Sequence, residues 1–212
     1  PLTEWLPKPA VPVCGLPLVR YALARLGAAG VGRAVVNVHH LAPAMEAAAR
    51  ASALAVGLPL SVSREPVIAG TGGALREARA LLDGAMVVLW NGDVLYDLDL
   101  EPVLRAHRRS GALATMVLAP MPPGGGYAAV EVDRDLAVRR IAWRGPGGAG
   151  LVPLHFTGVH VLSPGLLEAV PAAPFACDVN RDVYPPLLER GLVRGHLGSG
   201  AWNDLGTPAR YL

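Results

Sequence analysis

The chain has 212 residues, of which 52% are hydrophobic, and a formal net charge of +2 from 19 basic and 17 acidic residues. This length favours one domain with a sizeable core, and two cysteines are too few for a disulfide framework, so both are expected to be buried small hydrophobic residues in a reducing compartment. No apolar run approaches the length of a membrane span, no basic and apolar leader is visible, and the arginines are scattered, so we expect a cytoplasmic protein that binds neither membrane nor nucleic acid.

The first half of the chain alternates between helical and strand patterns. Apolar spacing and β-branched runs predict, in chain order, helix 17–29, strand 34–38, helix 41–56, strand 60–63, helix 74–82, strand 86–90, helix 101–109 and strand 112–119. The run 86–90 is apolar throughout, which is typical of a central parallel strand buried on both faces. This order predicts an α/β fold with a Rossmann-like, doubly wound sheet.

After Pro120 the pattern changes. Residues 127–133 and 137–143 alternate as the two strands of a hairpin do, and loops are expected at 120–126 and 145–150. The remaining predicted elements are strand 153–162, helix 182–190 and strand 192–197. We therefore expect one domain, 1–212, in which a small antiparallel extension is built onto a mixed sheet.

Asn91, Gly92 and Asp93 follow the most apolar strand directly. Asn-Gly is also the commonest hairpin signal, but residues 94–97 lead into a helix and not into a second alternating strand. In open α/β sheets, ligands bind beyond the carboxyl ends of the strands, and a glycine there would let a ligand approach the backbone closely. Asp93 is therefore a candidate site residue.

A second aspartate and the only lysine complete a candidate phosphate site. Asp204 lies in a Gly/Pro-rich turn, where the competing interpretation is an ordinary turn aspartate. Two aspartates from different strand ends can hold one Mg²⁺ while substrate phosphates complete its octahedron. Lys8 stands between two prolines that restrict its backbone, and it would act as a point charge for phosphate.

A glycine-rich turn, Gly70, Thr71, Gly72 and Gly73, opens a predicted helix. Free backbone N–H groups at a helix start favour an anion, although neither the P-loop nor the Rossmann spacing is present. The same glycines would equally let a nucleobase lie against bare backbone. The turn therefore suggests substrate binding without deciding between the two.

The histidines are not expected to bind metal. His39 and His40 end a strand, but no partner at i, i+4 and no cysteine pair completes a zinc set. His155 and His160 lie in an apolar strand and are predicted to be core residues with satisfied hydrogen bonds.

Six segments resemble the sugar-1-phosphate nucleotidyltransferases, or nucleotide-sugar pyrophosphorylases, and they occur in the family's order along essentially the whole chain. They are 1–9, 15–18, 65–74, 91–93, 156–158 and 202–208. Within the family, the chain resembles the mannose-1-phosphate guanylyltransferases and the amino-sugar-1-phosphate uridylyltransferases. The resemblance implies transfer of a nucleotidyl group from an NTP to a sugar 1-phosphate, giving an NDP-sugar and pyrophosphate.

The same resemblance implies residue roles. Asp93 and Asp204 would hold Mg²⁺ as cofactor, and Lys8 and Asp93 would be catalytic, with Lys8 on phosphate in the transition state. The implied substrate-binding residues are Glu65, Gly70, Thr71, Gly72 and Gly73 on the base side, and Asn91, Glu131, Thr157 and Gly158. Because the sugar phosphate oxygen attacks the α-phosphorus in line, catalysis would consist of positioning and charge neutralisation.

Three departures from the family pattern matter. The family's first strand and its Gly-rich loop with an arginine would precede Pro1, so this chain alone is expected to bind nucleotide poorly. Ala142-Trp143-Arg144 stands where some members have Glu-Lys-Pro, which removes the expected second phosphate lysine. Glu65 stands where many thymidylyl members have glutamine, and its acceptors match the N1–H and N2–H donors of guanine, so we expect a preference for GTP.

Two alternatives stay open. A non-catalytic homologue is favoured by the missing loop and disfavoured by the presence of Lys8, Asp93 and Asp204 together. A transferase with a nucleotide-sugar donor would use a D-x-D pair, but Asp97-Leu98-Asp99 is interpreted better as the N-terminal cap of a helix. The sequence leaves the oligomeric state open: a homo-oligomer is compatible with it, whereas trimerisation through a hexapeptide-repeat β-helix is not expected.

Overall fold

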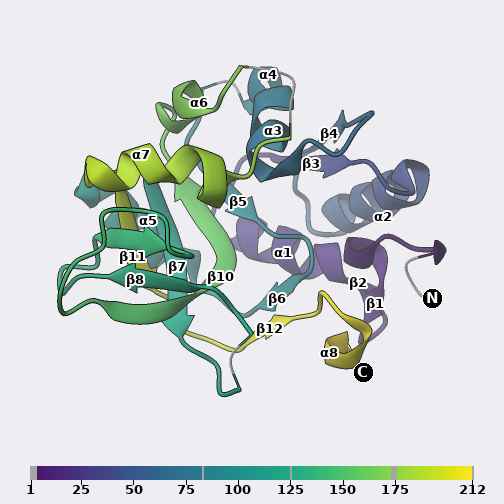
Figure 1. Cartoon of the computed structure of the whole chain (residues 1–212). Coiled ribbons are helices and arrows are strands. Elements are labelled where there is room, and N and C mark those ends of the chain that lie inside the picture. Colours follow the sequence, from purple (N-terminus) through teal and green to yellow (C-terminus); the bar gives the residue numbers. More distant parts are fainter. Residues whose placement is uncertain (1–3, 83, 125, 173–175, 212) are drawn as a thin grey trace.

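A computed structural model of the chain describes residues 4–82, 84–124, 126–172 and 176–211 (Figure 1). The helices are α1 Leu18–Ala28, α2 Ala42–Ala55, α3 Gly70–Glu77, α4 Arg79–Leu82, α5 Leu100–Ser110, α6 Leu166–Ala169, α7 Tyr184–Glu189 and α8 Pro208–Tyr211, with a 3₁₀ turn at Lys8–Ala10 and a π-helical turn at Val179–Val183. The strands are β1 Pro12–Val13, β2 Leu16–Pro17, β3 Ala34–Val38, β4 Leu60–Arg64, β5 Val87–Trp90, β6 Val94–Tyr96, β7 Ala114–Pro120, β8 Ala129–Val132, β9 Val138–Ile141, β10 Val152–Leu162, β11 Val193–Leu197 and β12 Trp202–Asp204.

Strand β10 is the centre of the six-stranded mixed sheet. One of its edges pairs antiparallel with β7, which pairs in parallel with β11. Its other edge pairs with β8 at residues 152–155 and with β5 at residues 159–162. A register shift relative to β7 lies between these two stretches, where Gly158 has a φ of +88°. A single strand therefore serves both the main sheet and the antiparallel extension β8–β9.

Three two-stranded sheets accompany the main one within the described residues, and the first is the antiparallel pair β1–β2. Strands β3 and β4 pair in parallel and are joined by α2, which makes a βαβ unit. Strand β6 pairs antiparallel with β12, so the segment after β5 lies beside the segment 202–204. The structure confirms the α/β class, the mixed sheet and the small antiparallel extension. In the described residues, no helix is long and apolar enough to cross a membrane.

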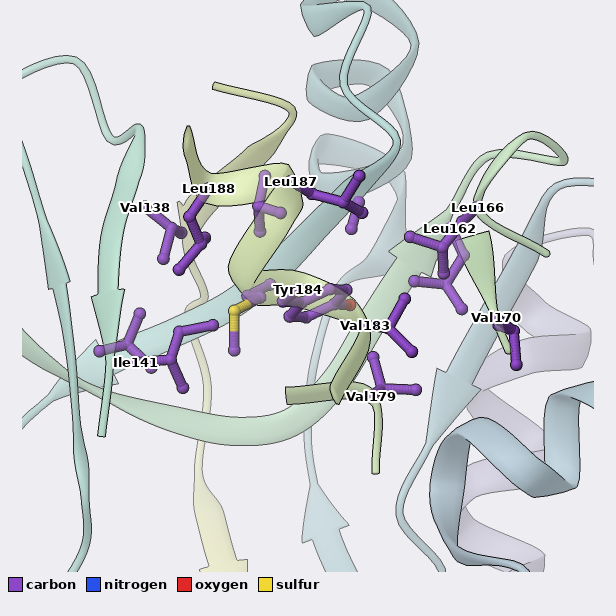
Figure 2. Packing of buried hydrophobic residues seen from close by; sticks show 14 of the residues in the cluster. Val138, Ile141, Leu162, Leu166, Val170, Val179, Val183, Tyr184, Leu187 and Leu188 are labelled. Atoms are coloured by element: carbon purple, nitrogen blue, oxygen red, sulfur yellow. The ribbon is translucent and has the colours of Figure 1, made fainter. Parts of the chain in front are cut away.

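Buried side chains form one cluster on each face of the main sheet. Met116 and Leu118 of β7 belong to the cluster under α6 and α7, while Val117 between them belongs to the cluster under α1, α2 and α5. This alternation is what a strand covered on both faces requires. Figure 2 shows Tyr184 in the middle of the first cluster, surrounded by aliphatic side chains of α6, α7 and β10.

Several local predictions are wrong. The helix predicted at 74–82 begins at Gly70 and is interrupted at Ala78, and residues 94–96 form a strand because they pair with the distant β12. Cys177 is buried as expected, but Cys14 is exposed in the turn between β1 and β2, with a φ of +48°. His160 is a satisfied core residue, whereas His155 is buried and neither of its ring nitrogens has a hydrogen-bond partner among the described residues.

The buried histidine His160 makes the stability of the fold depend on pH. Its Nδ1 lies 2.8 Å from the hydroxyl of Tyr184, and burial lowers the pKa of His160 from 6.5 to about 3. Because the unfolded chain takes up this proton first, the stabilising contribution of neutral His160 is complete above about pH 6.5 and is lost as the pH falls toward 3. We expect the free energy of unfolding of the wild type to fall more steeply than that of His160→Asn, by about 1.4 kcal/mol per pH unit. Urea unfolding at pH 7, 6, 5 and 4 measures both slopes, and parallel slopes would contradict the assignment.

Candidate active site

The turn Asn91–Asp93 at the carboxyl end of β5 is held by two distant segments. The N–H of Asn91 donates to the carbonyl of Gly158 on β10, at 2.9 Å. The carbonyl of Asp93 accepts from the N–H of Leu205, also at 2.9 Å. The bulge in β10 and the turn after β12 therefore fix the backbone of the turn that carries Asp93.

Gly92 brings the N-terminal turn to this site. A Cβ on Gly92 would lie 2.7 Å from Cγ of Pro9, so only glycine allows the two segments to pack. The close approach at Gly92 is thus made by Pro9 and not, as the sequence suggested, by a ligand. It places Nζ of Lys8 at 3.9 Å from Oδ2 of Asp93, with both side chains partly exposed.

We expect Gly92→Ala to destabilise the protein by about 1–3 kcal/mol, since the added methyl group overpacks against Pro9. Gly32→Ala is the matched control, because a Cβ there meets no atom of the described part of the chain within 4 Å. Urea unfolding compares the two variants with the wild type. Equal stability of both variants would show that Pro9 can move away from a side chain at residue 92 without a measurable loss of stability.

Asp204 faces Asp93 across Gly206. A Cβ on Gly206 would lie 2.8 Å from Oδ1 of Asp204 and 3.2 Å from Oδ2 of Asp93. The missing side chain therefore leaves a small space that both carboxylates border. Two carboxylate oxygens around one space are a donor set that suits Mg²⁺. No group of three or more His, Cys, Asp or Glu within the described ranges could hold a metal, so a cation here would need further ligands from phosphate and water.

The outer side of Asp204 is held by an aromatic cluster and an arginine. Its Oδ2 accepts from the hydroxyl of Tyr127 at 2.9 Å and from Nη1 of Arg210, while Oδ1 accepts from the N–H of Gly206. The ring of His155 packs on that of Tyr127 with centroids 4.2 Å apart. Burial and the bond to Asp204 both raise the pKa of Tyr127, so its hydroxyl remains a donor. Burial lowers the pKa of His155, partly opposed by the charge of Asp204.

A cavity of about 1240 Å³ adjoins this site, between β3 and β5. Its walls include six of the predicted site residues, which are Lys8, Glu65, Gly70, Thr71, Asn91 and Asp93. Six other predicted residues do not line the cavity, namely Gly72, Gly73, Glu131, Thr157, Gly158 and Asp204. The cavity thus joins three of the five residues expected on the base side to Lys8 and Asp93. Asp204 lies outside its lining and approaches Asp93 across Gly206.

Glu65 is only 6% exposed, and both of its carboxylate oxygens have donors. Oε1 accepts from Nδ2 of Asn37 at 3.0 Å, and Oε2 accepts from the N–H of Ala69 at 3.2 Å. Nδ1 of His39 lies 2.8 Å from the carbonyl of Glu65. These bonds tie the end of β3 to the turn before α3, and they reduce the acceptor capacity on which the expected preference for GTP rests. Asn37 and His39 were not predicted, although both stand at a strand end.

The glycine-rich turn is occupied by the protein itself. The N–H groups of Gly72 and Gly73 donate to the carbonyl of Cys177, at 2.8 and 3.2 Å. A Cβ on Gly72 would lie 2.6 Å from Sγ of Cys177, which explains the glycine there. Oγ1 of Thr71 donates to Asp178 and accepts from the N–H of Val179. The interpretation of this turn as an anion cradle is therefore wrong for Gly72 and Gly73.

The remaining predicted residues also have partners in the fold. Glu131 pairs with Arg140 across β8 and β9 at 3.0 Å. Thr157 is fully buried, and its hydroxyl donates to the carbonyl of Val117 at 2.9 Å. Asp99 caps α5 by accepting from the N–H of Glu101, as its sequence position indicated. The sugar contacts of Glu131, Thr157 and Gly158 stay predictions.

Comparison with known proteins places the chain in a family. A family model described as "Nucleotidyl transferase" matches residues 1–212. The mannose-1-phosphate guanylyltransferase of Mycobacterium tuberculosis is 28% identical over 214 residues, which cover 100% of this chain and 58% of that protein. The UTP–glucose-1-phosphate uridylyltransferase of Synechocystis sp. is 28% identical over 226 residues, with the same coverage. The chain thus spans 58% of the length of both relatives.

Solved structures show the same fold. HddC from Yersinia pseudotuberculosis superposes with a TM-score of 0.78 at 20% identity, covering 97% of this chain and 87% of that one. A putative glucose-1-phosphate thymidylyltransferase from Bacillus anthracis superposes with a TM-score of 0.83 at 16% identity, covering 99% and 85%. Because the family model matches the chain from its first residue to its last, the chain belongs to the nucleotidyl transferase family.

Proposed function

We propose that the protein transfers a nucleotidyl group from an NTP to a sugar 1-phosphate, releasing pyrophosphate. The observation that carries this proposal is the meeting of Lys8, Asp93 and Asp204 at the carboxyl end of β5. The family membership of the chain and the activities named for its relatives, guanylyl transfer to mannose 1-phosphate and uridylyl transfer to glucose 1-phosphate, support the reaction class.

In the proposed reaction, an oxygen of the sugar phosphate attacks the α-phosphorus of the NTP, and the bond to the leaving pyrophosphate breaks. Asp93 and Asp204 would hold Mg²⁺, which when bound supplies positive charge against the phosphates. Lys8 places a second positive charge beside Asp93 and would neutralise charge that develops on phosphate oxygens. Asn91 precedes Asp93 in the same turn and would contact substrate.

For the substrates, we propose GTP and mannose 1-phosphate, with a UTP-dependent enzyme of an amino-sugar 1-phosphate as the second candidate. The family resemblance favours the first, although Glu65 already accepts two protein hydrogen bonds. Pyrophosphate release from the full-length protein, measured with a panel of NTPs and sugar 1-phosphates in Mg²⁺, tests the reaction and both candidates. Comparable turnover of GTP and UTP would sink the preference for GTP, and no release from any pair would favour a non-catalytic homologue. We place the activity in the cytoplasm.

We also propose that a further strand completes the domain between β3 and β5. Among the described residues, β3 pairs only with β4 and β5 only with β10, so each has one edge without a partner. Every residue in the stretches 30–40 and 85–93 lines the cavity. Because successive side chains of a strand point to opposite faces, such continuous contact means that the cavity meets both strands at their edges.

The surroundings of this cavity suit a buried strand. Val19 and Leu23 of α1 and Ala74 and Leu75 of α3 line it as well. Strand β5 is apolar throughout, yet all four of its residues are only half-buried. A strand supplied by residues upstream of Pro1 and running parallel to β3 would be joined to it through α1, as β3 is joined to β4 through α2.

Hydrogen exchange tests this strand. A protein extended upstream should protect the amides of β3 and β5 at least tenfold more than the 212-residue chain does, since the new strand shields both edges. The amides of β7 and β10, which already have partners, are the internal control. Equal exchange of the β3 and β5 amides in both proteins would refute the added strand.

A further inference from the structure

Each of the two aspartates has its own basic partner. Lys8 pairs with Asp93, and Arg210 on α8 pairs with Asp204. The two cations come from opposite ends of the sequence, and both are substantially exposed, at 49% for the Lys8 side chain and 41% for that of Arg210. The candidate site is thus built from two acid–base pairs that face each other across Gly206.

Arg210 contacts the side of Asp204 that points away from Asp93. It donates to Oδ2, whereas Oδ1 is the oxygen beside Gly206 and Asp93. The guanidinium carbon lies 4.8 Å from the ring centre of Tyr127, whose hydroxyl shares Oδ2 with Arg210. A guanidinium stacked on an aromatic ring keeps its plane and its remaining N–H donors available for a second partner.

The two acid–base pairs determine the net charge that an incoming phosphate meets near Gly206. Lys8 and Arg210 balance Asp93 and Asp204, so the site as folded offers a phosphate no net positive charge. A divalent cation on the two carboxylates would reduce their attraction for both basic side chains. The released guanidinium would then be a planar donor of the geometry that binds phosphate oxygens in pairs.

We propose that Arg210 is a second phosphate-binding cation of this site, which exchanges Asp204 for phosphate oxygens of the substrate or of pyrophosphate when the aspartates carry a divalent cation. This inference rests on the proposed function. Arg210 would then bind phosphate beside Asp204, as Lys8 is proposed to do beside Asp93. It needs no new position for the backbone of α8, because the guanidinium is at the end of a long and partly exposed side chain.

Binding of inorganic pyrophosphate to the full-length protein tests the proposal by calorimetry, with and without Mg²⁺. We expect Arg210→Gln to lower the affinity for pyrophosphate in Mg²⁺ by about 10- to 100-fold, the loss of one charge-assisted contact. Arg210→Lys should retain part of the affinity. Arg50→Gln is the matched control, because Arg50 is also about half exposed and pairs with a carboxylate, Glu46. Unchanged affinity in Arg210→Gln would overturn the proposal.

Binding of Mn²⁺ alone, followed by electron paramagnetic resonance, separates this role from a structural one. Loss of the competing positive charge should leave Mn²⁺ binding of Arg210→Gln equal to that of the wild type or tighter. Weaker Mn²⁺ binding would mean that Arg210 only holds Asp204 in place, and the proposal would be wrong. Failure of the proposed function would look different: no NTP and sugar 1-phosphate pair would release pyrophosphate, while Mg²⁺-dependent pyrophosphate binding still required Arg210.

Discussion

Asp93→Asn is expected to abolish pyrophosphate release by the full-length protein, with a loss of about 10³-fold or more in kcat. The substitution keeps the shape of the side chain but removes one of the two negative charges that border the space beside Gly206. The fold should persist, because the carbonyl of residue 93 accepts from Leu205 regardless of the side chain. Steady-state assays at saturating Mg²⁺ and a thermal melt measure the two properties.

Asp97→Asn is the matched control for this prediction. Asp97 lies four residues along the chain and is also partnered by a cation, Arg25, but it stands outside the cavity. It should retain wild-type turnover within a factor of about three, as expected for an exposed ion pair. An Asp93→Asn protein that turns over as fast as Asp97→Asn would show that Asp93 is not a metal ligand.

Lys8→Ala is expected to lower kcat/KM by about 10²- to 10³-fold, the effect typical of removing one group that stabilises transition-state charge. The charge of Lys8 lies beside Asp93, so its loss should affect turnover more than folding. Lys8→Arg restores the charge with a broader, planar head and should recover only part of the rate. Initial rates over a range of NTP concentrations give the values. Full activity in Lys8→Ala would remove the lysine from the mechanism.

The sequence predicted those features of the fold that depend on local pattern. The helices at 17–29 and 41–56 and the strands at 34–38 and 153–162 agree with α1, α2, β3 and β10 within a residue or so. Their apolar periodicity is strong, and their tertiary contacts favour the same secondary structure as the local pattern does. The strand β6 was missed because its partner β12 lies about a hundred residues away, and no local pattern encodes such a pairing.

In the candidate site too, some residues could be predicted from the local sequence and others depend on contacts between distant segments. Lys8, Asp93 and Asp204 were selected from chemistry and position, and the structure brings them together. The turn 70–73 was expected to offer free N–H groups or bare backbone to a ligand, but Gly70 and Gly72 are required by the close approach of Cys177, which lies far along the chain. Tyr127 and Arg210 could not be found in advance, because their importance comes only from contact with Asp204.

The assembly of the site from residues 8 and 210 has a consequence for biosynthesis. A ribosome that has made β5 and its following turn has exposed Asp93, but Asp204 and Arg210 are still to be translated. The nascent chain can therefore form α1, α2 and the β3–β4 unit early, while the pair of carboxylates closes only after residue 204 has left the exit tunnel. Contacts of such long sequence separation are slow to form, so a folding chain should acquire its helices well before it can bind a divalent cation.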